Sequence, residues 1–427
     1  MRDRGWNDRP ATDVVRKHRP DYLIALYTGL LMLIGLIVIY AIGPQRANVL
    51  NNAIGSNFSD EYFFIKQTVS LLLAITAFGL ISIIPYNLFL KHSGKLLVAG
   101  LIACGVLFIA SSAGLPIAEA TNGASRWFNL GALGSLQPAE IVKFGLLLYL
   151  AVFLGARAKE GKVNDLKATL LPVAVIAGLS LMFIVVIQRD LGTGIALSAI
   201  VITMLFVAGM NRKVSLGLAI LVLLVGAIFI FTAPHRMERI MTYLRGDDTS
   251  TSDADSYHIE HAKIAIGSGG LYGVGIGNSV QATGYLPEVI NDSVFAVLGE
   301  TFGFIGLIAL MAVFVALLLR LLKVLDHLVD IRLKLLVAGV FGWFGAHVIL
   351  NIAAMLGIVP LTGITLPLIS FGGTSMIFIT AALGLVFQLS RYTVHSSRLQ
   401  TSGDTTHENS RSGRRVGRTR YASRRSS

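Results

Sequence analysis

Seven ionisable residues lie in or beside long apolar stretches of the sequence, where a charge is costly unless it has a partner or a function. They are, in chain order, Arg126, Glu140, Lys143, Arg189, Asp190, Glu288 and Asp292. A positioned carboxylate can act as a general base, and nearby cations can stabilise negative charge on a leaving group. Together these residues therefore predict a site for an anionic amphiphile at a membrane boundary.

Simpler structural roles remain open for the same residues. Glu140 and Lys143 are three positions apart, so they could form only an ion pair on a helix surface. Asp190 and Asp292 each precede an apolar stretch and could cap the helix that begins there. Glu300 lies deeper in its apolar stretch, and we interpret it as a hydrogen-bond partner between helices rather than a catalytic group.

The composition shows what surrounds these residues. Of the 427 residues, 54% are hydrophobic and 14% are charged, and the mean hydropathy is +0.70. Soluble domains carry about 25% charged residues, so lipid must be the solvent for most of this chain. This excludes a soluble enzyme with a single anchor and a disordered regulator. A disulfide scaffold is excluded as well, because Cys104 is the single cysteine.

Ten apolar segments are candidates to cross the hydrocarbon core, which takes about 20 residues as a helix. They are residues 22–42, 63–84, 95–113, 139–155, 169–187, 191–209, 215–233, 292–319, 334–356 and 370–390. We therefore predict an all-α polytopic membrane protein with about ten transmembrane helices. Lys and Arg are concentrated in alternate loops, which predicts cytoplasmic termini and one long extracytoplasmic loop, residues 234–291.

Two terminal segments flank the predicted membrane domain, residues 22–390. Residues 1–21 form a cytoplasmic segment, and residues 391–427 form a basic tail with nine arginines and two acidic residues. The net charge of +12 lies mainly in this tail, which we predict to be disordered and close to anionic membrane lipids. Nucleic-acid binding is not expected, since nothing aromatic or folded accompanies the arginines. The glycine-rich run 267–277 is expected to be a flexible, close-packed connector, because it lacks the context of a phosphate loop.

Three ordered motifs carry a resemblance to a known family. They read GASRW at 123–127 with LQPAE at 136–140 and Lys143, GNSV at 277–280 with YLPE at 285–288 and Asp292, and GIVPLTGITLPLISFGG at 357–373. Over residues 22–390 the chain resembles the SEDS family, named for shape, elongation, division and sporulation. The second motif is more similar to the division members of the family than to the elongation members.

The chain departs from the family pattern at three positions. Arg189 stands where the family usually has proline, which adds a cation where a backbone kink is expected. The family usually has His-Thr directly before the aspartate, whereas this chain has Ile290 and Asn291 before Asp292. No role of that histidine can therefore be transferred to this chain. Ser293 replaces a usual aromatic residue, and looser packing around Asp292 is expected.

The resemblance implies a peptidoglycan glycosyltransferase that polymerises lipid II on the outer face of the bacterial cytoplasmic membrane, at the division septum. It implies a class B penicillin-binding protein (a transpeptidase) and other division proteins as partners. Asp292 is the expected base for the acceptor hydroxyl. Arg126, Lys143 and Arg189, or a divalent cation such as Mg²⁺ or Mn²⁺, would stabilise the departing undecaprenyl pyrophosphate. Glu140 would orient Lys143 or serve as a supporting acid. No organic cofactor is expected.

Three alternatives to a septal polymerase remain. An elongation polymerase would carry out the same reaction at another place in the cell. A lipid II flippase or other transporter should carry ionisable residues near the bilayer midplane and on both sides, whereas the candidates here gather on the predicted outer side. A scaffold that only docks a division partner would explain the basic tail but not the carboxylates and cations.

Overall fold

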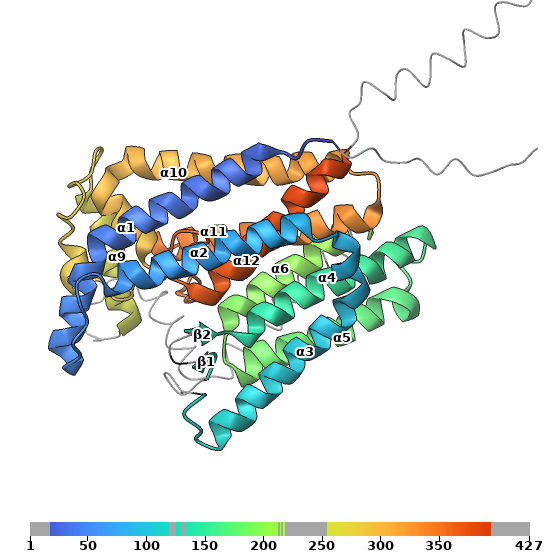
Figure 1. Ribbon diagram of the computed structural model, residues 1–427, viewed down its shortest axis with the longest axis horizontal. Helices are drawn as coiled ribbons and strands as arrows, with labels where there is room; N and C mark the ends of the chain where they lie inside the picture. The colour runs from blue at the N-terminus through green and yellow to red at the C-terminus, as the bar shows by residue number, and fades with distance from the viewer. Residues whose placement is uncertain are drawn as a thin grey trace, which may run out of the picture.

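A computed structural model describes residues 18–118, 125–129, 131, 134–211, 214, 217 and 254–393. The described part is almost entirely helical (Figure 1). Its longer helices are α1 (Tyr22–Ile54), α2 (Tyr62–Ile83), α3 (Tyr86–Ser112), α4 (Pro138–Lys159), α5 (Leu171–Leu181), α6 (Leu191–Val207), α9 (Ala254–Ser268), α10 (Val294–His327), α11 (Ile331–Met355) and α12 (Gly373–Leu389). π-Helical turns at Leu166–Leu170 and Met182–Ile187 extend α5 at both ends, and short 3₁₀ helices lie at Gln281–Thr283 and Ser390–Tyr392.

Eight of the described helical segments are long and apolar enough to cross a membrane. They coincide with eight of the predicted spans, so the prediction of an α-helical, multi-pass membrane protein is confirmed. A ninth predicted span corresponds to α6, which is apolar but has 17 residues. The predicted span 215–233 falls almost wholly outside the described residues, as do most of the N-terminal segment and the basic tail. The count of ten therefore stays a prediction.

Several helices are longer than their apolar stretches predict. α1 continues past Pro44 to Ile54, where Gly55 ends it in the left-handed conformation with φ of 66°. α10 continues to His327, past Arg320 and Lys323. Hydropathy marks the part of a helix that lipid surrounds, but backbone hydrogen bonds can continue into the polar region. The predicted helices therefore ended too early.

Helices α4, α11 and α12 form the interior of the bundle. In their most apolar stretches 72%, 72% and 78% of the residues are buried, against 11% in α2. α4 packs against α3 and α11, α11 also packs against α6, and α12 packs against α2. In Figure 1, α1 and α10 run side by side along one edge, with α3 at the opposite edge. Most residues in the apolar stretches of α4 and α11 therefore face other helices rather than lipid.

The two ends of the described chain meet on one side of the bundle. The backbone N–H of His18 donates to the carbonyl of Arg391 at 2.8 Å, and that of Asp21 donates to the Ser390 hydroxyl at 2.8 Å. In Figure 1 this end lies at the right, whereas α1 ends and α10 begins at the left. The predicted site residue Asp292, which precedes α10, is thus at the opposite end from both described termini.

The glycine-rich run 267–277 is packed against a break in α10. Gly303 interrupts the helix with φ of 67° and ψ of −169°. Four backbone hydrogen bonds join the two segments, from Val274 and Gly275 to the carbonyls of Glu300 and Thr301, and from Phe304 and Ile305 to those of Gly270 and Leu271. A Cβ atom on Gly273 would lie 2.2 Å from the carbonyl oxygen of Thr301. The connector is therefore close-packed, as predicted, and these bonds hold it in place.

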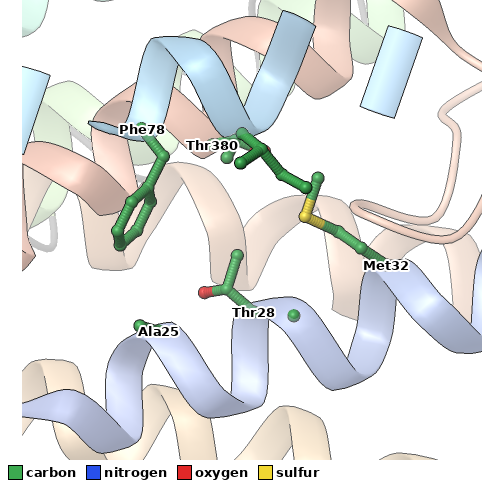
Figure 2. A pocket seen from close by; sticks show the side chains of 7 residues that line it. Ala25, Thr28, Met32, Phe78 and Thr380 are labelled. Carbon is green, nitrogen blue, oxygen red and sulfur yellow. The ribbon is translucent and has the colours of Figure 1, made fainter. Parts of the chain in front are cut away.

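A cavity of about 190 Å³ lies between α1, α2 and α12 (Figure 2). Its lining consists of Ala25, Thr28, Gly29, Met32, Ile75, Phe78 and Thr380. Figure 2 shows Thr28 and Met32 of α1 facing α2 and α12 across it. The lining carries no ionisable group, so this cavity is separate from the seven predicted site residues.

Candidate functional site

Asp190 occupies the turn between the α5 segment and α6. Its Oδ1 accepts from the backbone N–H of Thr193 at 3.0 Å, and its Oδ2 accepts from the Thr193 hydroxyl at 2.9 Å. These are the bonds of a helix N-cap, so the capping interpretation of Asp190 is confirmed. Gln137, just before α4, also donates to Oδ2 at 3.1 Å. Asp190 therefore joins the beginnings of α4 and α6.

Arg126 holds the same turn from another side. Its Nε donates to the carbonyl of Gln188 at 3.3 Å, and its Nη2 donates to the carbonyl of Arg189 at 2.8 Å. Arg189 itself is exposed and has φ of +53°. Proline cannot adopt this conformation, because its ring holds φ near −65°. The turn that proline would shape therefore has a different backbone here, which Arg126 supports.

Glu140 and Lys143 form a buried ion pair in the first turns of α4. Lys143 Nζ lies 2.7 Å from Glu140 Oε1, and the two side chains are 0% and 2% exposed. The interpretation as a surface ion pair is therefore wrong. The Lys143 ammonium also lies 4.8 Å from the ring centroid of Trp343 on α11. Glu140 Oε2 is buried and has no hydrogen-bond partner among the described residues.

Asp292 lies in the loop that leads into α10. The cap position of α10 is Ser293, which makes no capping side-chain bond, and the capping interpretation of Asp292 stays a prediction. Glu288, with φ of +47°, lies four residues earlier in the same loop. Its carboxylate is 3.6 Å from Arg46 Nη2 of α1 and accepts from the side-chain amide of Asn291. Glu288 therefore anchors the loop to the end of α1.

The seven predicted site residues fall into two groups, which form the two halves of the candidate site. One half contains Arg126, Glu140, Lys143, Arg189 and Asp190, joined by the bonds around the Asp190 turn and by the buried pair. The other half contains Glu288 and Asp292 in the loop before α10. The segment from Pro360 to Gly373 lies against both, because Thr362 and Ile364 pack on Gly192 of α6 and the N–H of Phe371 donates to the carbonyl of Ile290 at 2.7 Å.

The model of a family described as "Cell cycle protein", named for FtsW, RodA and SpoVE, matches residues 21–395. The chain belongs to this family. The motifs at 123–143, 277–292 and 357–373 predicted this membership, since FtsW and RodA are members of the SEDS family.

Individual relatives in the FtsW/RodA/SpoVE family are about one-third identical to the chain. Stage V sporulation protein E of Bacillus subtilis (strain 168) is 32% identical over 378 residues, which cover 88% of this chain and 98% of that protein. The probable peptidoglycan glycosyltransferase FtsW of Aliivibrio salmonicida (strain LFI1238) is 32% identical over 334 residues, which cover 77% of this chain and 80% of that protein.

Solved structures have the same fold. A chain from a peptidoglycan synthase complex, studied for its coordination of polymerization and crosslinking, has a TM-score of 0.66 and 25% identity, covering 87% of this chain and 98% of that one. The rod shape determining protein RodA of Thermus thermophilus has a TM-score of 0.61 and 25% identity, covering 88% and 98%. The helical arrangement described above is therefore that of the FtsW/RodA/SpoVE family.

Ser293, which departs from the family pattern, is well packed. It is fully buried, its hydroxyl donates to the carbonyl of Pro287 at 2.7 Å, and it accepts from Nε2 of His258 at 2.5 Å. The expectation of looser packing beside Asp292 is therefore wrong, because hydrogen bonds replace the missing aromatic contacts. His258 comes from α9, and its contact with Ser293 was missed from the sequence, since nothing local connects the two residues.

Glu300 and Asn351 complete the polar contacts near this loop. Glu300 accepts from the Ser279 hydroxyl at 2.5 Å and from the backbone N–H of Val280 at 2.9 Å, so it is a hydrogen-bond partner as predicted, but its partners lie in a loop rather than on another helix. Asn351 donates to the carbonyl of Asp292 and was missed. A polar amide in an otherwise apolar helix was the signal that could have found it.

In the described part of the chain no group of three or more His, Cys, Asp or Glu residues is placed to hold a metal ion. Magnesium ions are commonly held by one or two carboxylates together with substrate phosphates. A cation held in this way needs no group of three protein ligands, so the expected Mg²⁺ or Mn²⁺ stays a prediction, and we assign no step of the reaction to it.

Proposed function

We propose that this protein is a peptidoglycan glycosyltransferase that polymerises lipid II at the outer face of the cytoplasmic membrane, in septal wall synthesis. The observation that carries the proposal is the position of Asp292, on a loop held by hydrogen bonds from Ser293 to Pro287 and from Asn351 to the Asp292 carbonyl. Relatives named FtsW support the activity and the septal role. A RodA-like role in elongation is the alternative within the same chemistry.

Asp292 acts as the general base of the transfer. The 4-hydroxyl oxygen of the acceptor sugar attacks the anomeric carbon of the lipid-linked donor, and the bond from that carbon to the pyrophosphate oxygen breaks. The hydroxyl proton passes to the Asp292 carboxylate, and undecaprenyl pyrophosphate leaves. A base placed in this way contributes about 10²–10⁴-fold to the rate.

Cations in the other half receive the pyrophosphate. The exposed side chain of Arg189 is free to turn toward an anionic headgroup, while Arg126 and Asp190 keep its turn in shape. Lys143 is completely buried, so it meets the leaving group only if the substrate opens its contact with Glu140. Glu288 keeps the Asp292 loop against α1 and borders the same headgroup.

A class B penicillin-binding protein is the proposed partner. The likeness to a chain of a peptidoglycan synthase complex, at a TM-score of 0.66, supports this assignment. The partner would crosslink the strands that this protein makes. Division proteins and anionic lipids are further proposed partners of the segments beyond the described residues.

A lipid II transporter is the second candidate, and one observation favours it. The Glu140–Lys143 pair is buried inside the bundle, and transport pathways in membranes are lined by such paired charges. The Pro360–Gly373 segment, however, contacts Gly192 beside the Asp190 turn and binds Ile290 beside Asp292, so both halves of the site lie at one end of the bundle. This distribution favours chemistry at one face over passage through the bundle.

Strand synthesis from purified lipid II tests the proposal. The wild type, with its cognate penicillin-binding protein, is compared with Asp292→Asn, and Asp326→Asn near the far end of α10 serves as the matched control. We expect polymer from the wild type and the control, and a loss of at least 10²-fold in Asp292→Asn. Equal polymer from Asp292→Asn would remove the base assignment. No polymer from the wild type, with lipid II movement across liposomes instead, would favour the transporter.

A further inference from the structure

Asn351 joins two segments that are far apart in the sequence. It is 1% exposed and lies on α11. Its Nδ2 donates to the carbonyl of Asp292 at 2.7 Å and to the carbonyl of Ile364 at 2.7 Å. Both hydrogens of the amide are therefore used on backbone oxygens, and one of these belongs to the proposed base itself.

The hydrogen bond from Asn351 to Ile364 connects Asp292 to the half of the site that contains Asp190. A Cβ atom on Gly192 would lie 2.5 Å from Ile364 Cγ1 and 2.8 Å from the carbonyl oxygen of Thr362, so α6 contacts this segment closely. Gly192 is two residues after Asp190, which caps α6 and binds Gln137. Asn351 thus lies between the backbone of Asp292 and the segment that packs against the Asp190 turn.

We infer that Asn351 is a positioning residue, which sets the backbone of Asp292 relative to the half of the site that contains the cations. This inference rests on the proposed function of Asp292. A side-chain amide suits the place because one nitrogen carries two hydrogens for two carbonyls. A leucine of similar size has no donor and would leave the buried Ile364 carbonyl and the half-buried Asp292 carbonyl without this bond. The loop would then shift to find other partners.

The matched control is Gln388 on α12. It is also a buried amide, and its Nε2 donates to the carbonyls of Ile84 at 2.6 Å and Ser82 at 3.3 Å. These contacts lie at the end of α12 near the described termini, far from Asp292. Asn351→Leu and Gln388→Leu therefore remove the same kind of bond at opposite ends of the bundle. A purely structural role predicts the same kinetic result for both.

Steady-state polymerisation of lipid II by the complex with the partner tests the inference. A displacement of about 1 Å can cost 10²-fold in rate, so we expect Asn351→Leu to lower kcat by about that factor with KM changed less than about threefold. Gln388→Leu should keep kcat within about threefold while lowering thermal stability. A kcat for Asn351→Leu within the range of Gln388→Leu would overturn the inference.

One further variant and the Asp292→Asn result keep the test decisive. If Asn351→Leu does not fold, Asn351→Ser, a smaller change that keeps one hydroxyl donor, should fold and show a smaller loss of kcat in the same assay. Wild-type kcat in that variant would contradict the inference. If Asp292→Asn polymerises as well as the wild type, the proposed base fails and this inference fails with it. If only Asn351→Leu is fully active, the base assignment stands and the positioning role alone is wrong.

Discussion

The buried pair of Glu140 and Lys143 should show a strong energetic coupling. Their charged atoms are 2.7 Å apart and both side chains are shielded from solvent. Lys143→Met leaves a buried carboxylate whose Oε2 already lacks a hydrogen-bond partner in the described part of the chain. Glu140→Gln leaves an ammonium group beside the ring of Trp343, which replaces only part of the lost attraction. The double variant removes both charges.

The separation sets the size of the expected effect. At 2.7 Å and an effective dielectric constant of about 20, the Coulomb attraction is about 6 kcal/mol. Desolvation of both charges offsets much of it, and removing one partner of a buried pair typically costs about 3–5 kcal/mol. We expect each single variant to lose free energy of unfolding in this range. The double variant should lose at least about 2 kcal/mol less than the sum of the singles.

The single cysteine offers a direct assay of unfolding. Cys104 is fully buried in α3, which packs against α4. Its thiol becomes reactive only when the bundle opens, so a thiol-reactive fluorescent probe reports unfolding without further labelling. Titrating denaturant in detergent or nanodiscs then gives the free energy of unfolding for each variant. Polymerisation of lipid II is measured in parallel, and the double variant should remain inactive if Lys143 contacts the pyrophosphate.

Additive losses would refute this reasoning. If the double variant loses as much free energy as the two singles together, the charges are not coupled. If each single variant loses less than about 1 kcal/mol, as exposed pairs do, the pair is solvated. Either result would also remove the argument that Glu140 orients Lys143.

Two other predictions concern the turns at either side of the bundle. Arg189→Gly should stabilise its turn by about 1 kcal/mol, because glycine adopts positive φ without strain. Arg189→Pro should lower both thermal stability and polymerisation. Equal thermal stability of the two variants would contradict the argument from φ. Burial raises the pKa of Asp330. Hydrogen bonds from Arg332, together with the positive charges of Arg332 and Lys159, outweigh this effect and hold the pKa below its ordinary 3.8. The ionised form therefore stabilises the fold above pH 3.8, and this contribution is lost as the pH falls through the lower folded-state pKa. Asp330→Asn should thus lower the unfolding free energy at pH 7, with a difference from wild type that shrinks in acid, and a constant difference would contradict the assignment.

Local chemistry determined much of this protein in the sequence itself. Long apolar segments predicted the membrane helices, because a backbone in lipid must satisfy its own hydrogen bonds. Asp190 predicted its cap, because the bonds to Thr193 span three residues. The motifs around Arg126, Asp292 and Gly357 predicted the family. The ends of α1 and α10 were missed, because a helix can continue beyond the residues that lie in the hydrocarbon core.

Only the tertiary structure decided how these residues are used. The burial of Lys143 depends on α11 covering α4, and an i, i+3 spacing is the same on a surface and in an interior. Arg126 binds carbonyls 62 and 63 residues away, and Asn351 reaches one 59 residues away. Such contacts depend on how whole helices pack against one another. The sequence therefore predicts which groups are available, and packing decides which of them meet.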